Sequence, residues 1–196
     1  MIFGLEMNFK NIMIITILIV ILYLLLSRKF SPIVYFNTKE LTPEQKQKFL
    51  YLSNSVRNKC NKDIRKLEWD DELAKYAAQT ATHLANNRYC SLIHSNSYDD
   101  INAGENLAWT KGVADPIRAG INGWSGEGFR EHATGPVTGH YTAMNWSNAS
   151  KIGCGIANSS CGTVISCNYK SPDGQLTPNT LGYYNTMVKC TKPISV

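Results

Sequence analysis

The hydrophobic pattern of the chain begins with a long apolar run close to its N-terminus. Residues 12–26 are apolar except for Thr16, with Lys10 before them and Arg28-Lys29 after them. This length is the upper limit of a signal-peptide core and falls short of the roughly 20 residues that cross a bilayer. No small-residue cleavage signal follows, so residues 1–31 are interpreted as either a cleaved signal peptide or an uncleaved signal anchor.

Beyond a linker that we place at residues 32–44, apolar positions recur with the spacing of amphipathic helices. The order Thr42-Pro43-Glu44-Gln45 has threonine as N-cap, proline at the first helical position and glutamine at the third, and it predicts a helix to about Asn58. A second helix is predicted from Trp69 to about Asn86, because acidic residues in its first turn suit the helix dipole. Its many alanines predict close packing against a sheet.

The second half of the chain changes from helical to strand-like patterns. The helical period is lost between residues 89 and 110, which we interpret as a loop, and returns in a predicted helix over residues 117–130. Two strand-like runs, 151–157 and 163–169, are joined by a short polar segment, which is a hairpin pattern. Helices followed by strands predict an α+β fold in which the helices cover an antiparallel sheet.

The cysteines place this domain in an oxidising compartment. Six cysteines follow the apolar run, and none forms a C-x-x-C pair. An even number behind such a leader is typical of disulfides, and the spacing argues against a zinc ribbon or a thioredoxin-like site. We therefore expect the protein to enter the secretory pathway, and either to be secreted or to be anchored by residues 12–26 with the domain outside. The cysteine count alone does not decide the pairing.

Length and charge limit the remaining possibilities. The chain has 196 residues and a net charge of +5; Lys10, Arg28 and Lys29 against Glu6 give the N-terminal segment +2, which leaves +3. About 165 residues then remain, the size of one domain with its own core. Such a mild positive excess argues against a nucleic-acid partner, which would need a clustered basic face.

Four polar residues carry the candidate chemistry. They are His94 in Leu-Ile-His-Ser, Glu105 in Gly-Glu-Asn, Glu127 in Trp-Ser-Gly-Glu and His140 in Gly-His-Tyr-Thr. Two imidazoles and two carboxylates are groups that hold a divalent metal or move a proton. No two of the four lie within one helical turn and no H-E-x-x-H motif occurs, so the spacing does not show that they meet.

These four pieces, in this order and followed by Cys167-Asn168-Tyr169, resemble the CAP superfamily. That superfamily contains cysteine-rich secretory proteins, antigen 5 and pathogenesis-related 1 proteins. The resemblance runs from about residue 45 to about residue 185, and we place the CAP (SCP) domain at residues 45–190, with a tail at 191–196. It implies a three-layer α-β-α sandwich with a mostly antiparallel central sheet.

The resemblance also implies that the four residues line one cleft, in which His94 and His140 can bind zinc as an optional cofactor. The same residues could instead form a hydrogen-bonded network that fixes loops to the core without turnover. We predict a non-catalytic protein that binds a lipid or sterol, a divalent metal or an extracellular protein, in a defence, venom-like or host-interaction role. The alternative is a metal-dependent hydrolase that uses the same cleft, since the fold does not choose between these functions.

The resemblance further implies two of the disulfides. In the family, a Gly-Cys-Gly before the hairpin commonly pairs with the cysteine of Cys-Asn-Tyr, and the cysteine before the first histidine commonly reaches the hairpin loop. We expect Cys154–Cys167 and Cys90–Cys161 on this basis, and Cys60–Cys190 by elimination. The first pair is also supported by its place on two strand-like runs joined by a short loop, which could bring the Cα atoms within bridging distance.

Three sequons and two departures from the family complete the sequence picture. Asn148 and Asn158 begin glycosylation sequons in plausible loops, whereas the sequon at Asn145 lies in the core motif and is expected to be buried. The family signature that usually ends in Pro-Pro-Gly-Asn reads Ser-Pro-Asp-Gly-Gln at residues 171–175, which weakens the case for a ligand contact there. Residues 132–138 lack the cysteine found before Gly-His in plant-type members.

Overall fold

The chain separates into two units, Met1–Tyr35 and Phe36–Val196, and the fold described below is that of the second unit. The computed structural model describes residues 13, 15–18, 39–128, 139–172, 188, 190 and 192–196. The rest of residues 1–31, where a signal peptide or anchor is predicted, lies outside the described residues. Among the described residues, no helix has the length and apolar character needed to cross a membrane.

The first helix of the domain, α2 (Pro43–Cys60), begins at the predicted capping box. Thr42 Oγ1 accepts from Gln45 N, and Gln45 Oε1 accepts from Thr42 N at 2.9 Å. Each side chain satisfies a backbone N–H donor that the helix start would otherwise leave unpaired. The helix ends two residues beyond the predicted end, at Cys60.

The second helix, α3 (Asp71–Asn87), begins slightly later than predicted. Asp70 is its N-cap and accepts from Leu73 N at 3.0 Å. Trp69, predicted as the start of this helix, lies instead in the two-residue strand β1 (Glu68–Trp69). The acidic first turn that predicted the helix therefore gives its position to within two residues.

The interpretation of residues 89–110 as a loop was wrong. This segment contains a short helix, α4 (Ser97–Ile101), and a seven-residue strand, β2 (Gly104–Thr110). Helix α4 has five residues, too few for a helical period to be seen in the sequence. Strand β2 alternates between the two faces of the sheet, but both faces are largely covered, so the polar–apolar alternation of a half-exposed strand is absent.

Two further helices differ from their predictions. Helix α5 (Pro116–Gly126) is capped by Asp115 and ends before Glu127, whereas a helix to Arg130 was predicted. A glycine at the last position weakens the helix there, and Arg130 itself lies outside the described residues. Helix α6 (Gly139–Met144) was not predicted, because it has only six residues.

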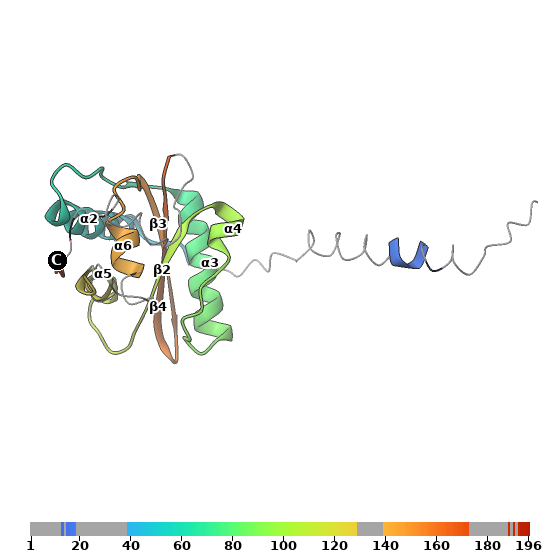
Figure 1. Ribbon diagram of the computed structural model, residues 1–196. Helices are drawn as coiled ribbons and strands as arrows, with labels where there is room; N and C mark the ends of the chain where they lie inside the picture. The colour runs from blue at the N-terminus through green and yellow to red at the C-terminus, as the bar shows by residue number, and fades with distance from the viewer. Residues whose placement is uncertain are drawn as a thin grey trace, which may run out of the picture. The chain divides into compact units, whose positions relative to one another are not determined.

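The predicted hairpin is confirmed in strands β3 (Lys151–Ser159) and β4 (Gly162–Lys170). The sheet order is β1-β3-β4-β2; β3 and β2 both pair antiparallel to β4, and β1 pairs parallel to β3. Helices α2, α5 and α6 lie on one face of the sheet, and α3 lies on the other with α4 beside it (Figure 1). The predicted three-layer sandwich with a mostly antiparallel sheet is confirmed.

Glycines on β3 allow α3 to lie directly on the sheet. A Cβ atom added at Gly153 would lie 2.1 Å from Ala74 N, and one added at Gly155 would lie 2.3 Å from the Cα of Ala78. The backbone of α3 therefore occupies the space that any larger side chain would need. The predicted close packing of this alanine-rich helix on a sheet is confirmed.

All three predicted disulfides are present. Cys154 and Cys167 are direct register partners across the β3–β4 hairpin. Cys90, just after α3, is bonded to Cys161 in the hairpin turn. Cys60, the last residue of α2, is bonded to Cys190, which closes a sequence separation of 130 residues.

Candidate functional site

Four predicted site residues meet beside β2, one of the two edge strands of the sheet. Glu105 is the second residue of β2, and His94 lies in the segment between α3 and α4. Glu127 follows the last residue of α5, and His140 is the second residue of α6. One histidine–carboxylate pair thus comes from the α3 side of the sheet and the other from the α5–α6 side. The two imidazole centroids lie 6.5 Å apart.

The first pair is built around a buried carboxylate. Glu105 Oε1 contacts His94 Nδ1 at 2.9 Å and accepts from the Ser95 backbone N–H at 2.9 Å. Its Oε2 accepts from the Ser95 hydroxyl at 2.6 Å and from the Ser166 hydroxyl at 3.5 Å. The Glu105 side chain is 3% exposed, whereas that of His94 is 62% exposed. The carboxylate therefore fixes the loop, and the imidazole faces solvent.

The charges of this first pair support each other. Burial alone would raise the pKa of Glu105, but hydrogen bonds from His94 and Ser95 outweigh it, and the pKa is lowered. The hydrogen bond to Glu105 raises the pKa of His94, against the smaller effect of burial. A metal ion at His94 would therefore compete with a proton that the neighbouring carboxylate favours.

The loop that carries His94 is also tied to α3. The hydroxyl of Tyr76 on α3 donates to Asp100 Oδ2 on α4 at 2.7 Å. Burial, and next this hydrogen bond, raise the pKa of Tyr76 well above its usual range, so the phenol stays a donor. This contact holds α4 against α3 and so fixes both ends of the short segment in which His94 lies.

The second pair is held by a helix end and an aromatic ring. Glu127 Oε1 contacts His140 Nδ1 at 2.5 Å, and its Oε2 accepts from the Tyr141 backbone N–H at 3.2 Å in the first turn of α6. The Trp124 ring lies stacked near the His140 ring, with centroids 6.3 Å apart. Asn106 on β2 donates to the His140 carbonyl at 3.0 Å. Both His140 and Glu127 side chains are partly exposed, at 29% and 21%.

The geometry leaves the same nitrogen of each ring for a ligand. Each Nδ1 contacts a carboxylate, which favours the tautomer with its proton on Nδ1 and its lone pair on Nε2. A tetrahedral zinc ion with Zn–N bonds of about 2.0–2.1 Å would put two imidazole centroids about 5 Å apart. The observed 6.5 Å is within reach of a small movement of the exposed His94 ring.

The two imidazoles are the metal ligands that the described residues supply. Within the described ranges, no group of three or more histidine, cysteine, aspartate or glutamate side chains is arranged to hold a metal ion. The described residues therefore fit a site with two histidine ligands. Such a site binds more weakly than a structural site with four protein ligands.

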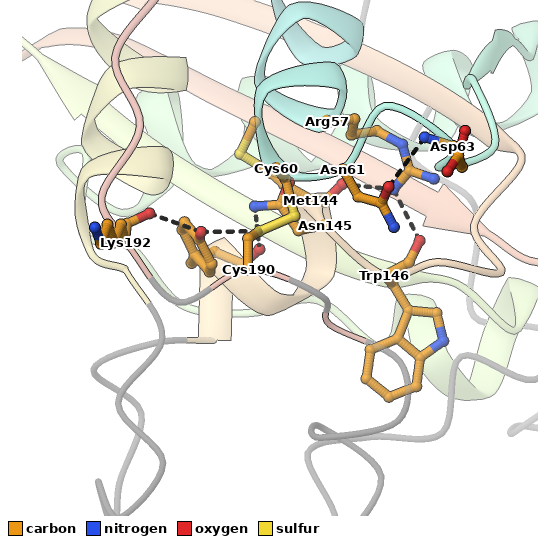
Figure 2. The surroundings of a disulfide bond; sticks show 10 residues. Arg57, Cys60, Asn61, Asp63, Met144, Asn145, Trp146, Cys190 and Lys192 are labelled. Carbon is orange, nitrogen blue, oxygen red and sulfur yellow. Dashed lines mark hydrogen bonds between the residues drawn. A yellow bond between two sulfur atoms is a disulfide. The ribbon is translucent and has the colours of Figure 1, made fainter.

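A buried arginine that sequence analysis missed supports the His140 side. Arg57 on α2 is 1% exposed, and its guanidinium donates to the carbonyls of Arg65, Met144, Trp146 and Ala149 at 2.6–3.0 Å. Figure 2 shows it reaching the end of α6. Burial lowers its pKa to about 10, so it remains charged at neutral pH. The one sequence signal was a charged residue on the apolar stripe of α2.

The C-terminal strap, defined here as residues 190 and 192–196, also supports the His140 side. The hydroxyl of Tyr141 on α6 donates to the Lys192 carbonyl at 2.8 Å, and that of Ser125 on α5 donates to the Ile194 carbonyl at 2.6 Å. The Cys60–Cys190 disulfide ties the strap to the end of α2 (Figure 2). The strap therefore holds together the two helices that carry Glu127 and His140.

The predicted glycosylation sites differ in exposure. Asn148 and Asn158 are exposed, as an acceptor must be, whereas Asn145 is fully buried. Glycosylation at Asn148 and Asn158 stays a prediction. The departures at residues 132–138 and 173–175 lie outside the described residues.

Comparisons with known proteins identify the family. Residues 50–169 match the model of the cysteine-rich secretory protein family, CAP. The chain is 34% identical over 133 residues to pathogenesis-related protein 1C of Nicotiana tabacum, covering 64% of this chain and 74% of that protein. It is 34% identical over 128 residues to pathogenesis-related protein 1 of Arabidopsis thaliana, covering 63% and 74%.

Solved structures support the fold. The hookworm platelet inhibitor matches with a TM-score of 0.56 and 19% identity, covering 74% of this chain and 79% of that one. A second structure, described as NaASP2 with Zn2+, matches with a TM-score of 0.53 and 23% identity, covering 81% and 90%. At these identities the likeness concerns the fold alone.

Proposed function

Because the chain belongs to the cysteine-rich secretory protein family, CAP, we propose that it is a non-catalytic binding protein that acts outside the cell. Its relatives include a pathogenesis-related protein of Nicotiana tabacum and a scoloptoxin of Scolopendra dehaani, which supports secretion and a defence or host-interaction role. We propose further that the site beside β2 binds a divalent metal through His94 and His140, with zinc as the first candidate.

One observation carries this proposal: both carboxylates already serve to orient the imidazoles. Glu105 is buried and contacts four hydrogen-bonding groups, and Glu127 contacts the His140 ring and the backbone of α6. A hydrolase of this type needs a carboxylate that takes a proton from the attacking water. Both carboxylates here are engaged, which favours binding over the alternative of a metal-dependent hydrolase.

The roles within the site follow from these contacts. His94 and His140 would hold the ion through Nε2, while Glu105 and Glu127 keep each ring in place and in the required tautomer. Bound zinc would supply a Lewis-acidic centre with open positions for an oxygen or nitrogen donor of a partner. The fold neighbour described with Zn2+ supports the choice of zinc as the probe.

The lipid, sterol or extracellular protein predicted as a partner stays a prediction. A hollow of about 460 Å³ lies beside β1, near the starts of α2 and α3, and is lined in part by Leu41, Trp69 and Ala78. Lys46 and Asp71 also line it, and their side chains pair at 2.8 Å. This charged wall is a poor match for the apolar body of a sterol, so the metal site is the stronger basis for a test.

Calorimetric titration of the metal-free protein with zinc tests the proposal. We expect one site in the native protein, an affinity at least tenfold weaker in His94→Gln and in His140→Gln, and no change in His83→Gln, which alters a histidine on α3 outside the site. Equal affinity in all four proteins would contradict the metal site.

A second measurement separates binding from hydrolysis. Zinc-loaded protein is incubated with a broad peptide pool, alongside a Glu127→Gln variant whose fold is checked by circular dichroism. We expect no cleavage by either protein. Cleavage by the native protein that disappears in Glu127→Gln would show that the cleft is a hydrolase site.

A further inference from the structure

The large apolar side chains that the domain leaves exposed are gathered in one part of the chain. In the described part of Phe36–Val196, seven large hydrophobic side chains are exposed, and six of them lie between residues 89 and 113. These six are Tyr89, Leu92, Ile93, Tyr98, Trp109 and Val113. The seventh, Tyr51, lies on α2. Exposed apolar groups scattered singly need no explanation, but a concentrated set marks an interaction surface.

Two of these side chains, Tyr89 and Trp109, flank the Cys90–Cys161 disulfide. Tyr89 precedes Cys90, and Trp109 Nε1 donates to the Cys161 carbonyl at 3.1 Å. The Trp109 ring also lies over Gly162, where an added Cβ would come within 2.6 Å of its Nε1. Both side chains therefore lie at the hairpin-turn end of the sheet, where α3 also ends (Figure 1). This end, Tyr89 and Trp109 with the disulfide between them, is called the aromatic tip below.

The backbone holds Tyr89 outward in a conformation that an L-residue rarely adopts. Tyr89 and Cys90 have φ values of 51° and 60°, so two consecutive non-glycine residues are left-handed. The disulfide and a hydrogen bond from Cys90 N to the Leu84 carbonyl at 3.0 Å keep them there. The result is a tyrosine side chain that is 91% exposed. A strained backbone that leaves its side chain exposed, and so gains no burial, is typical of a functional surface.

The charge around the aromatic tip is positive. Arg88 precedes Tyr89, and Lys111 follows Trp109 by two residues. The three segments that lie at this end, residues 84–91, 107–114 and 157–164, contain no aspartate or glutamate. The aromatic side chains are thus accompanied by cations and by no carboxylate from these segments.

We propose that the aromatic tip is a docking surface for an anionic lipid bilayer. Tryptophan and tyrosine favour the headgroup region, where an apolar ring and a polar atom are both accommodated. Leu92 and Ile93 add apolar area to the same loop, and Arg88 and Lys111 pair with lipid phosphates or carboxylates. A rigid, projecting tip fits a deformable bilayer better than a protein, which would need a matching pocket. The proposal is independent of metal binding.

The distribution of tryptophan makes the test specific to the domain. All four tryptophans, Trp69, Trp109, Trp124 and Trp146, lie beyond the N-terminal apolar run. Quenching of tryptophan fluorescence by lipids with brominated acyl chains therefore reports contact of the domain, even where the apolar run holds the chain on the vesicle. Trp109 is the tryptophan that is exposed, and Trp124 and Trp146 are buried.

The experiment uses the full chain, produced without glycans because Asn158 lies at the same end. It is mixed with brominated vesicles of phosphatidylcholine, with or without phosphatidylserine. We expect quenching with the anionic vesicles that weakens in high salt, loss of most of it in Trp109→Phe, and at least a fivefold loss in Tyr89→Ser. Tyr51→Ser, which alters an exposed tyrosine on α2 away from the tip, should match the native protein.

Several outcomes would overturn the proposal. They are no quenching of the native protein, equal quenching by neutral vesicles, and full quenching in Trp109→Phe. Circular dichroism of each variant identifies a loss of fold, and Trp109→Phe, a conservative change at a half-exposed site, keeps the test valid if Tyr89→Ser misfolds. A dimer in sedimentation that Tyr89→Ser abolishes would assign the tip to a second copy of the chain and not to lipid.

Discussion

The two halves of the candidate site reach the same geometry by different means. The His94 half is a loop fixed by a buried carboxylate, Glu105, and stapled nearby by Cys90–Cys161. The His140 half is a helix start whose carboxylate, Glu127, is partly exposed, and its support comes from Arg57 and the C-terminal strap. The His94 half is thus held by a residue of the site itself, and the His140 half is held by residues outside the site.

This difference separates the role of each carboxylate. Removal of Glu105 takes away the hydrogen bonds that fix the His94 loop. A variant at Glu105 therefore changes the stability of the fold as well as the metal site. Removal of Glu127 leaves α6 anchored by Arg57 and by Tyr141, so a variant there tests the site itself. The predictions below either break one half alone or measure how the halves differ.

The largest effect is expected from the disulfide behind the His140 half. Replacing both Cys60 and Cys190 by serine reopens a loop of 130 residues and should lower the free energy of unfolding by about 5 kcal/mol in the chain-entropy model. Urea unfolding measures this. Zinc affinity should also fall, because release of the strap from α5 and α6 leaves His140 less firmly held.

The matched control replaces Cys90 and Cys161 by serine, where the separation is 71 residues. This double variant should lower the free energy of unfolding by about 4 kcal/mol. It should also shift the NMR resonances of the His94 ring more than those of the His140 ring. If both double variants shift the same ring, the two halves are not independently supported.

The second effect concerns the buried guanidinium. Arg57→Met removes the guanidinium donor from four backbone carbonyls, of which that of Trp146 keeps its hydrogen bond from the Ala149 N–H. The change should destabilise the fold by about 3–4 kcal/mol and shift the NMR resonances of His140. The control is Lys59→Met, which removes an exposed lysine on the same helix and should cost less than about 0.5 kcal/mol. Equal stability of the two variants would show that the guanidinium contacts contribute nothing net.

The third effect compares the two carboxylates directly. Glu105→Ala leaves Ser95 and His94 without a buried acceptor and should cost about 2–3 kcal/mol, while Glu127→Ala should cost about 1 kcal/mol. Thermal unfolding of the two variants under one set of conditions gives the difference. A larger loss for Glu127 would reverse the assignment of the two halves.

The smallest effect is the pH dependence of the His94 half. The pKa of His94 is raised above its ordinary 6.5, so its stabilising contribution is complete below pH 6.5 and is lost as the pH rises through the folded value. The pKa of Glu105 is lowered from 4.5, so its contribution is present above pH 4.5 and is lost as the pH falls through the folded value.

Both contributions of the His94 half are therefore present between about pH 4.5 and 6.5. Because His94 is exposed, its share should stay below about 0.5 kcal/mol. Unfolding measured from pH 5 to pH 8 should show a small decline that His94→Gln removes. Zinc affinity should show the opposite trend and rise with pH, since the ion displaces the proton.

Sequence patterns predicted the helices and strands whose signals come from neighbouring residues. The capping box at Thr42, the acidic start of α3 and the hairpin of β3 and β4 each depend on neighbouring residues, and each was predicted to within a few residues. Strand β2 was missed because its register comes from pairing with β4 and its faces are covered by distant helices. The residues that meet at the site come from separate elements, so their proximity rested on the family resemblance.

The support behind the site could not be predicted from local pattern. Arg57 binds carbonyls as far as 92 residues away, and no sequence rule links an arginine to backbone acceptors. Its place on the apolar stripe of α2 was compatible with two outcomes, a buried arginine or an exposed one that interrupts the stripe. The sequence did not decide between them. The hydrogen bonds of the C-terminal strap likewise depend on the tertiary fold.

The two edges of the sheet bear on how the protein behaves at high concentration. Strand β1 has only two residues, and Glu68 is paired there with Lys151, so this edge offers a very short ladder to another chain. At the other edge, the Leu107 carbonyl of β2 accepts from the Trp124 indole. Pairing of exposed edge strands from different copies is a common route from a sheet to an insoluble aggregate. The same indole that packs beside His140 therefore also occupies a backbone acceptor that another chain would need for pairing at this edge.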